Sequence, residues 1–398
     1  MNIIAITVGS YPRGEASTNR NVSILKGLVE IGHNVKILII SPSNKKCASV
    51  RLKSGTIEGI NFKYTSFSVN WTQSSLKKII IVFYSIINAL IELNKMHMQE
   101  KIDAILILTP KSYIIHPILL FANIKKIKTF HERNEHPLLN FLSETNNLSF
   151  LSKLRLKYYL YLIIKISGLY VISHFLKSYF TQYIDESRIC IVNMTVDFNR
   201  FKGNAQSPFD FKYIAYCGTM HGNKDGLENL INAYALIENK IKYKLVLIGD
   251  NQDKKINKIL KLVKRKQLRD KIIFTGAINS NEIPRYLKNA DILALARPDN
   301  LQAKGGFPTK LGEYLMTGKP VIITSVGEIP LFLDDCVSAF IAQPDNIEDF
   351  AQKILYISNN YNKSLAVGKE GKKIAYKSFN YRIESCKLSK FISNIVNQ

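Results

Sequence analysis

The stretch from residue 305 to residue 322, GGFPTKLGEYLMTGKPVI, has the pattern of a loop, a short helix, a turn and the start of a strand. Pro308 and Thr309 suit the first turn of a helix, whose free amide groups favour a phosphate. Glu313 follows about one turn further in. A carboxylate can accept charge-assisted hydrogen bonds from two vicinal hydroxyl groups. The stretch therefore predicts a ribose site beside a helix-bound diphosphate, although a single exposed helix glutamate would look the same in isolation.

Two other glycine-containing loops follow expected strands. The loop from Gly9 to Gly14 comes after the first strand, and its glycines would let backbone amides approach an anion. Its spacing is not GxGxxG, which disfavours a dinucleotide-binding dehydrogenase, and a plain strand–helix turn remains the alternative. In the second loop Lys224 follows Gly218, and its ammonium group could hold a diphosphate as a point charge. A lysine at a loop tip can equally be solvated.

A third polar stretch, HERNEHP, begins at His131. Its spacing matches neither HExxH nor HxxEH, and no D-x-D occurs in the chain, so the sequence predicts no metal site. His131 is expected where a strand ends, which suits a catalytic or substrate-orienting role. Glu132, Arg133 and Glu135 are candidates for orienting the acceptor or the sugar. A cluster of side chains that only bind the backbone is the alternative.

Apolar runs alternate with longer amphipathic segments and would position these loops. The expected strands are Ile3–Gly9, Val35–Ser41, Ile60–Tyr64, Ala104–Thr109, Ile127–His131, Leu169–Ser173, Ile189–Asn193, Tyr213–Gly218, Lys244–Gly249, Ile272–Gly276, Asp291–Ala296 and Val321–Thr324. Such alternation predicts an α/β fold of parallel sheets covered by helices. The pattern restarts after a polar loop near residue 205, so we expect two Rossmann-like domains, 1–205 and 206–378, whose strand ends line a cleft.

Charge and hydropathy bear on which ligands the protein could bind and on whether it is secreted or spans a membrane. The net charge is +24 and is spread over both halves of the chain, so the surface would attract nucleic acid, anionic lipid or phosphorylated substrates alike. No nucleic-acid-reading module is visible, which disfavours nucleic acid. The sequence predicts no signal peptide, no membrane span and five free cysteines, as expected in the cytoplasm. Two basic, aromatic-containing helices, near residues 75–84 and 150–161, could rest on an anionic membrane; core helices with a basic edge are the alternative.

These motifs together resemble the family 4 glycosyltransferases of the group 1 type, which are retaining enzymes with the GT-B fold. The resemblance spans nearly the whole chain. It is carried by HERNEHP, VISHFLKSYF, NMTVDFNRF, YCGTMHGNKDGLENLINAYA, LVLIGD, FTGAINSNEIPRYLKNADILALAR and GFPTKLGEYLMTGKPVI, which stand in the family's order. It implies that the last helix, 379–398, packs back on the first domain.

The resemblance also implies roles for individual residues. Lys224 would neutralise the leaving diphosphate, Glu313 would bind the ribose, and His131 would touch the transferred sugar. The expected donor site consists of Gly9, Gly14, Gly218, Thr219, Lys224, Gly276, Ala277, Ile278, Gly306, Phe307, Pro308, Thr309, Lys310, Leu311 and Glu313. No cofactor is expected, and a uridine nucleotide is favoured over a guanosine one.

The chain departs from the family pattern at two positions. Gly305 stands where the family usually has a glutamate that contacts the sugar, and Thr219 stands where it often has an arginine. Lys310 could supply the missing positive charge, and Gln302 or Lys304 the sugar contact. The resemblance thus implies sugar transfer to a glycan or lipid-linked glycan in bacterial surface polysaccharide assembly, in the cytoplasm or peripherally at the inner face of the membrane. A non-catalytic nucleotide-sugar-binding subunit is the alternative.

Overall fold

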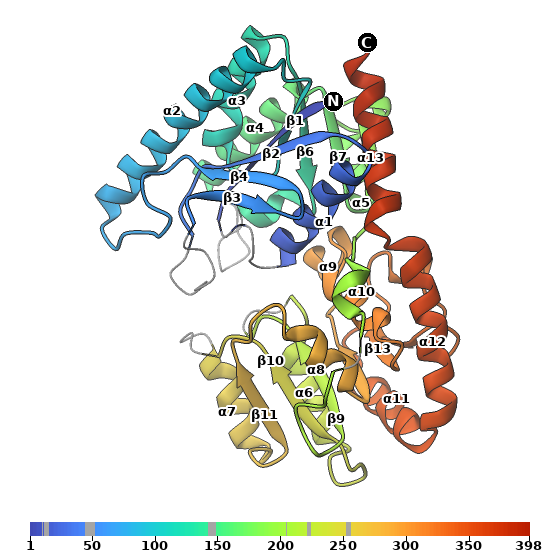
Figure 1. The fold of residues 1–398 in the computed structure, drawn as a ribbon. Helices are drawn as coiled ribbons and strands as arrows, with labels where there is room; N and C mark the ends of the chain where they lie inside the picture. Colours follow the sequence, from blue (N-terminus) through green and yellow to red (C-terminus); the bar gives the residue numbers. More distant parts are fainter. Residues whose placement is uncertain are drawn as a thin grey trace. The chain divides into compact units, whose positions relative to one another are not determined.

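The structure, a computed structural model, describes residues 1–9, 11, 16–43, 52–141, 149–203, 205–220, 224–251 and 256–398. The chain divides into two compact units (Figure 1). The first contains Met1–Thr195 and Tyr381–Gln398, and the second contains Val196–Asn380. The division after Thr195 precedes the boundary expected near residue 205, because Val196 already pairs with Asn380 of the second unit.

The first unit is built on an eight-stranded sheet with the order β3-β4-β2-β1-β5-β6-β7-β8. Neighbouring strands are parallel except for the β3–β4 pair. The strands are β1 (Asn2–Thr7), β2 (Asn34–Ile39), β3 (Ser54–Ile57), β4 (Ile60–Tyr64), β5 (Ala104–Ile107), β6 (Lys128–Arg133), β7 (Gly168–Val171) and β8 (Ile189–Ile191). The sequence did not predict β3, whose residues SGTI lack a buried apolar run. Its hairpin turns at Glu58 and Gly59, both with positive φ (50° and 77°), which a two-residue hairpin turn requires.

Helices cover both faces of this sheet. Figure 1 shows α1 (Ala16–Glu30) and α13 (Tyr381–Val396) along one side and α2 (Ser75–Gln99), α3 (Ser112–Ile124) and α4 (Phe150–Lys165) along the other. The shorter α5 (His174–Phe180) follows β7. Helix α13 packs closely on α1: Ser385 donates to the carbonyl oxygen of Ile24 at 2.9 Å, and a Cβ on Gly27 would lie 2.2 Å from Ser385 Oγ. The glycine therefore permits the close approach of the C-terminal helix to α1.

The second unit contains a parallel six-stranded sheet with the order β11-β10-β9-β12-β13-β14. Its strands are β9 (Tyr213–Cys217), β10 (Lys244–Ile248), β11 (Ile272–Gly276), β12 (Ile292–Leu295), β13 (Val321–Thr324) and β14 (Phe340–Ala342). Its helices are α6 (Leu227–Ala235), α7 (Asn257–Arg265), α8 (Ile283–Asn289), α9 (Leu301–Gly305), α10 (Thr309–Met316), α11 (Ile347–Asn359) and α12 (Tyr361–Ser378). The strand order reverses between β9 and β12, which is where sheets of this type bind ligands beyond the strand ends.

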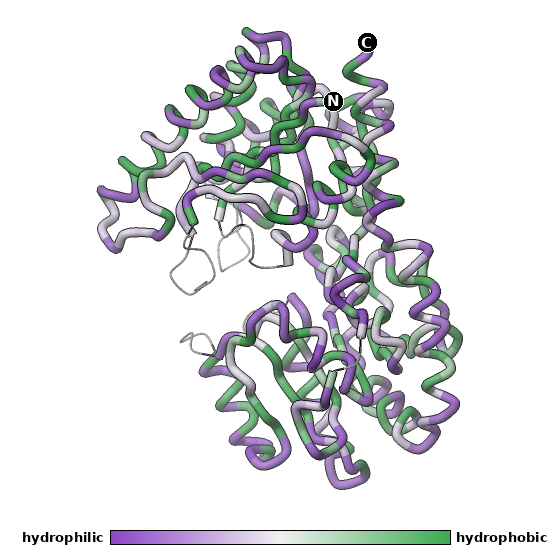
Figure 2. The backbone as a smooth tube through the Cα atoms, viewed as in Figure 1, coloured by the Kyte–Doolittle hydropathy of each residue, from purple (hydrophilic) through white to green (hydrophobic). Residues whose placement is uncertain are grey.

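The apolar residues of both units are concentrated in the strands, as the hydropathy colouring of Figure 2 shows. All four residues of β5 and of β12 are completely buried. Parallel strands covered on both faces carry such continuous apolar runs, which is why they could be located in the sequence. Among the described helices, none is both long and apolar enough to cross a membrane.

Candidate functional site

The loops at the switch point of the second sheet lie in direct contact. The loop after β9 leads through Gly218 to Gly226, which has φ +68°. A Cβ on Gly226 would lie 1.6 Å from the carbonyl oxygen of Ala296, the residue that follows β12. Only glycine fits there, so the β9 loop is held against the carboxyl end of β12.

Helix α10 is attached to the same strand ends. The backbone N–H of Cys217, the last residue of β9, donates to Tyr314 Oη at 2.7 Å. The segment before the helix is anchored by Phe307, which packs against Phe332 and Phe379 with ring centroids 5.4 and 5.3 Å apart. These contacts fix the N-terminus of α10, and with it the position of Lys310, beside Gly218.

Lys310 forms an ion pair with Asp225, whose side chain is only 5% exposed. Gly218 leaves room for this lysine, since a Cβ there would lie 2.2 Å from Lys310 Cε. The β9 loop is held further by Tyr216, which donates to the carbonyl oxygen of Thr219 at 2.7 Å. The sequence did not single out Asp225, although it is the residue that follows Lys224.

Positive charge exceeds negative charge around this carboxylate. Burial acts to raise the pKa of Asp225, but the charges of Lys310, Arg297 and Lys224 outweigh it, and the pKa lies below its usual value. Arg297 is almost completely buried and donates from Nε to the carbonyl oxygen of Lys224 at 3.4 Å. Three cations around one carboxylate leave an excess of positive charge, which favours an anionic ligand.

Glu313 lies one turn further along α10 and forms an ion pair with Arg200, from the short 3₁₀ helix Phe198–Phe201. Arg200 also donates to the carbonyl oxygen of Ser280 at 2.8 Å, in the loop after β11. That loop begins at Gly276, which has φ +74°. The exposed Ala277 and the half-buried Ile278 follow in the same loop. Arg200 was not among the predicted site residues, although it lies in the stretch NMTVDFNRF that contributed to the resemblance.

Several predicted donor-site residues are placed where only their backbone can meet a ligand. Leu311 is completely buried and Phe307 nearly so, while Pro308 is buried at the start of α10. Gly306 and Thr309 are partly exposed beside them. Gly305 is buried at the end of α9, and Lys304 next to it forms a 3.1 Å ion pair with Asp299. Gly305 itself therefore brings no carboxylate to the position where the family pattern has one.

His131 lies inside the first unit rather than at a strand end. Strand β6 continues to Arg133, two residues beyond the expected end, and the ring of His131 is completely buried. Its Nδ1 is 2.8 Å from the carbonyl oxygen of Ile107 and its Nε2 is 2.9 Å from Tyr159 Oη. Burial, with a smaller effect of the Arg133 charge, lowers the pKa of His131 to about 3. This placement does not fit the predicted contact with a sugar and favours a structural role.

The other candidates in the first unit also take part in internal contacts. Glu132 binds Arg20 of α1 at 3.2 Å, and Arg20 donates to the carbonyl oxygen of Val192 at 2.8 Å. Arg133 donates to the carbonyl oxygen of Glu135 at 2.8 Å and lies over the ring of Tyr159. These bonds connect α1 to the ends of β6 and β8 and agree with the alternative of a polar cluster.

The predicted glycine loop of the first unit is described only in part. Gly9 has φ +87° and donates to Ser41 Oγ at 3.1 Å. Gly14 lies outside the described residues.

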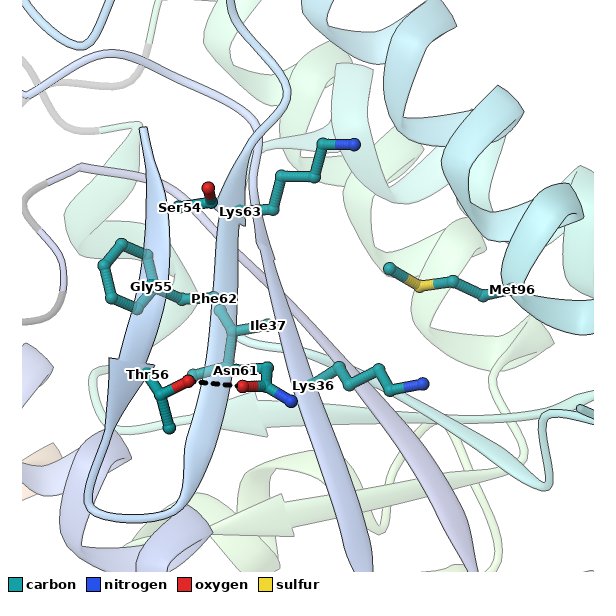
Figure 3. Close-up of a pocket in the computed structure, with 9 residues that line it drawn as sticks. All are labelled: Lys36, Ile37, Ser54, Gly55, Thr56, Asn61, Phe62, Lys63 and Met96. Carbon is teal, nitrogen blue, oxygen red and sulfur yellow. Dashed lines mark hydrogen bonds between the residues drawn. The ribbon is translucent and has the colours of Figure 1, made fainter. Parts of the chain in front are cut away.

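A separate hollow, shown in Figure 3, lies at the β3–β4 edge of the same sheet. It is lined by Lys36, Ile37, Ser54, Gly55, Thr56, Asn61, Phe62, Lys63 and Met96. Its Thr56 Oγ1 donates to Asn61 Oδ1 at 2.6 Å, and none of the predicted site residues lines it.

Comparisons with known proteins bear on the second unit most directly. Residues 211–360 match the model of the family described as "Glycosyl transferases group 1". A protein of Methanocaldococcus jannaschii, described as an uncharacterized glycosyltransferase, is 21% identical over 184 residues. That alignment covers 46% of this chain and 45% of the relative, so the chain matches less than half of the relative's length.

Solved structures match over the whole chain. Sucrose-phosphate synthase from Thermosynechococcus elongatus is similar with a TM-score of 0.77 and 14% identity, covering 100% of both chains. HepE from Anabaena in complex with UDP is similar with a TM-score of 0.72 and 15% identity, covering 99% of this chain and 100% of that chain. The chain has the GT-B fold. At these identities the likeness establishes the fold, which confirms the fold class predicted from the sequence.

Proposed function

We propose that this protein is a glycosyltransferase that moves a sugar from a nucleotide-diphosphate sugar to a hydroxyl group of a glycan or lipid-linked glycan. One observation carries the proposal: the N-terminus of α10, Lys310 and Lys224 gather positive charge at the switch point of the second sheet, and Glu313 lies one turn away on the same helix. The match of residues 211–360 to the group 1 family supports it. The UDP bound by a protein of similar fold favours a uridine nucleotide.

The proposed reaction retains the anomeric configuration. Double displacement requires a free carboxylate nucleophile, whereas Asp225 and Glu313 each bind a cation. We therefore propose front-face attack by the acceptor hydroxyl while the diphosphate leaves. The amides of α10, together with Lys310 and Lys224, stabilise the negative charge that develops on the leaving group. The departing phosphate takes the acceptor's proton. The proposed mechanism uses no metal ion, since the chain contains no D-x-D, and it uses no cofactor.

The biological setting follows from the resemblance described above. We propose that the acceptor belongs to a bacterial surface polysaccharide, such as capsule, exopolysaccharide or lipopolysaccharide, and that transfer takes place in the cytoplasm. The second candidate function is a nucleotide-sugar-binding subunit without activity of its own. It is favoured by Gly305, because a glycine brings no carboxylate to the position where the family usually has one.

A thermal-shift screen of uridine and guanosine diphosphates and their sugars tests the donor site. A ligand that binds only the native state raises the melting temperature by mass action. We expect uridine diphosphate to raise it for the wild type and to lose most of the effect with Glu313→Ala. The matched control is Glu282→Ala, which removes an exposed glutamate from the same unit. No shift with any nucleotide contradicts the proposal.

Turnover separates the two candidate functions. We expect slow hydrolysis of one uridine-diphosphate sugar in the absence of acceptor, with release of the sugar as its original anomer and no loss of rate in the presence of a chelator. Donor binding without hydrolysis or transfer, with lipid-linked acceptors supplied, would favour the binding subunit. Release of the opposite anomer, or inhibition by the chelator, would exclude the proposed mechanism.

A further inference from the structure

The outer surface of helices α2, α3 and α4 exposes many large apolar side chains. On α2 the buried residues Ile81, Ser85, Ala89 and Leu93 recur every four positions and face the protein interior. The rest of this largely apolar helix faces outward. The exposed apolar residues of the three helices are Leu76, Ile79, Ile80, Phe83, Tyr84, Ile87, Ile91, Met98, Tyr113, Leu120, Ile124, Phe150, Leu151, Leu154, Tyr158, Tyr161 and Ile164. Several are more exposed than buried, among them Leu76 (76%), Phe83 (68%) and Phe150 (78%).

These side chains belong to one layer of the first unit. Helix α3 packs against α2 and against α4 (Figure 1). The contact between α3 and α4 includes the rings of His116 and Tyr158, whose centroids are 5.9 Å apart. The exposed residues therefore belong to one layer of packed helices, and their outward surface is here called the α2–α4 face. Apolar patches of this extent on a protein surface mark binding sites rather than ordinary exposure.

The charge on the α2–α4 face is mainly positive. Segments 75–99, 111–126 and 149–165 contain the basic residues Lys77, Lys78, Lys95, Lys111, Lys125, Lys126, Lys153, Arg155, Lys157 and Lys165. Glu92 is the one acidic residue within these segments and forms a 2.8 Å ion pair with Lys63, and Glu100, the C-cap residue of α2, accepts from Asn34 Nδ2 at 3.0 Å. Two of the lysines lie over aromatic rings of the face, Lys111 over Tyr113 at 5.8 Å and Lys165 over Tyr161 at 5.4 Å. Cationic groups thus border the apolar side chains.

We propose that the α2–α4 face docks on the surface of an anionic lipid membrane. Exposed Leu, Ile, Phe and Tyr side chains with interspersed Lys and Arg fit the boundary between acyl chains and anionic headgroups. A second copy of the chain would bring two positively charged faces together, which charge repulsion disfavours. A nucleic acid would leave the apolar side chains without a partner. Docking concerns the first unit alone and stands whether or not the proposed sugar transfer takes place.

Vesicle flotation of the full-length protein tests the proposal. We expect binding to vesicles that contain phosphatidylglycerol, weaker binding to phosphatidylcholine alone, and a decrease in binding at high salt. Each basic residue near an anionic surface contributes a factor of about five to the partition coefficient. The triple variant Lys153→Glu, Arg155→Glu, Lys157→Glu should therefore lower that coefficient on the order of a hundredfold or more. The variant Ile80→Ser, Phe83→Ser should lower binding even at low salt.

Matched controls come from the second unit. The triple variant Lys261→Glu, Lys264→Glu, Arg265→Glu reverses the same number of charges on α7, and Leu331→Ser removes a leucine that is 66% exposed. Both should bind vesicles like the wild type, and all variants should retain the wild-type circular dichroism and melting temperature.

Three results would overturn the proposal. The first is no flotation with phosphatidylglycerol at low salt, and the second is equal loss of binding in the α4 and α7 charge variants. The third is a concentration-dependent dimer that Phe83→Ser abolishes, without vesicle binding, which would assign the face to a second copy of the chain.

Discussion

Arg200 donates a hydrogen bond to Glu313 Oε1 and a second one, of 2.8 Å, to the carbonyl oxygen of Ser280. It thereby connects helix α10 with the loop after β11. The side chains of the pair are 24% and 20% exposed, so water screens them only in part. Arg200 is thus a positioning residue for the carboxylate of the proposed donor site.

The first prediction concerns this arginine. Arg200→Ala should weaken binding of uridine diphosphate about fivefold, because Glu313 then loses the partner that fixes its orientation, a coupling of about 1 kcal/mol. Isothermal titration calorimetry measures the effect. In a background that already lacks Glu313, removal of Arg200 should change affinity much less. The control is Arg285→Ala, which removes an arginine on α8 that donates to the carbonyl oxygen of Gln206 at 2.9 Å. Unchanged or tighter binding by Arg200→Ala would contradict the positioning role.

The second prediction concerns the ribose. If Glu313 accepts hydrogen bonds from the ribose hydroxyls, the wild type should bind uridine diphosphate more tightly than its 2′-deoxy form, by about 1–3 kcal/mol as for hydrogen bonds to charged groups. Glu313→Ala should bind the two nucleotides almost equally, and Glu313→Gln should lie between. Equal discrimination by the wild type and Glu313→Ala would assign ribose recognition to another residue.

The third prediction compares two glycines of the β9 loop. Gly218→Ala should weaken diphosphate binding and lower stability less than Gly226→Ala does, because the added Cβ displaces the flexible end of Lys310, 2.2 Å away, rather than backbone. Gly226→Ala should instead lower the free energy of unfolding by about 2 kcal/mol or more, since its φ is +68° and the Cβ meets a backbone carbonyl. Urea unfolding and calorimetry together separate the two effects. Unchanged diphosphate binding by Gly218→Ala would contradict the role given to Lys310.

The strands could be located from the sequence because most are buried on both faces. Continuous apolar runs located twelve strands. Several of the predicted strands extend one or two residues too far at the carboxyl end. The sequence did not predict the edge strands β3 and β14, because SGTI and FIA are too short to be distinguished from loops by their apolar residues. The end of β6 was placed too early, since Glu132 and Arg133 are polar. Both are nevertheless buried in the strand, where Glu132 has Arg20 as its partner.

The proposed donor site was visible in the sequence only where its residues are neighbours. Lys310 and Glu313 lie in one short helix, so their spacing suggested a diphosphate and a ribose. Their partners Asp225 and Arg200 are 85 and 113 residues away in the chain. No local pattern indicates such pairs, which arise when parallel strands bring distant loops to one edge of a sheet. The burial of His131 could likewise not be predicted from the sequence, because the residues that contact its ring come from β5 and α4.

The fourth prediction concerns pH and the Asp225–Lys310 pair. The pKa of Asp225 is lower in the folded protein than in the unfolded chain, so its contribution to stability is complete above about pH 4 and is lost as the pH falls through the folded value. Asp225→Asn should therefore be less stable than the wild type at pH 7, by about 1–3 kcal/mol. The difference should shrink as the pH is lowered from 4 towards 2 in urea-unfolding series. A difference that does not change with pH would exclude the ion pair as its source.

The fifth prediction concerns His131. Its folded pKa of about 3 lies below the ordinary value of 6.5, so the folded ring stays neutral while the unfolded one takes up a proton below pH 6.5. The wild type should therefore lose stability, relative to His131→Gln, as the pH falls from 7.5 to 4.5, by at most about 1.4 kcal/mol per pH unit. Carbon-13 signals of the ring should show no titration between pH 5 and 8. A titration near pH 6.5, or a pH–rate profile of sugar transfer that disappears in His131→Gln, would instead support the catalytic role expected from the sequence.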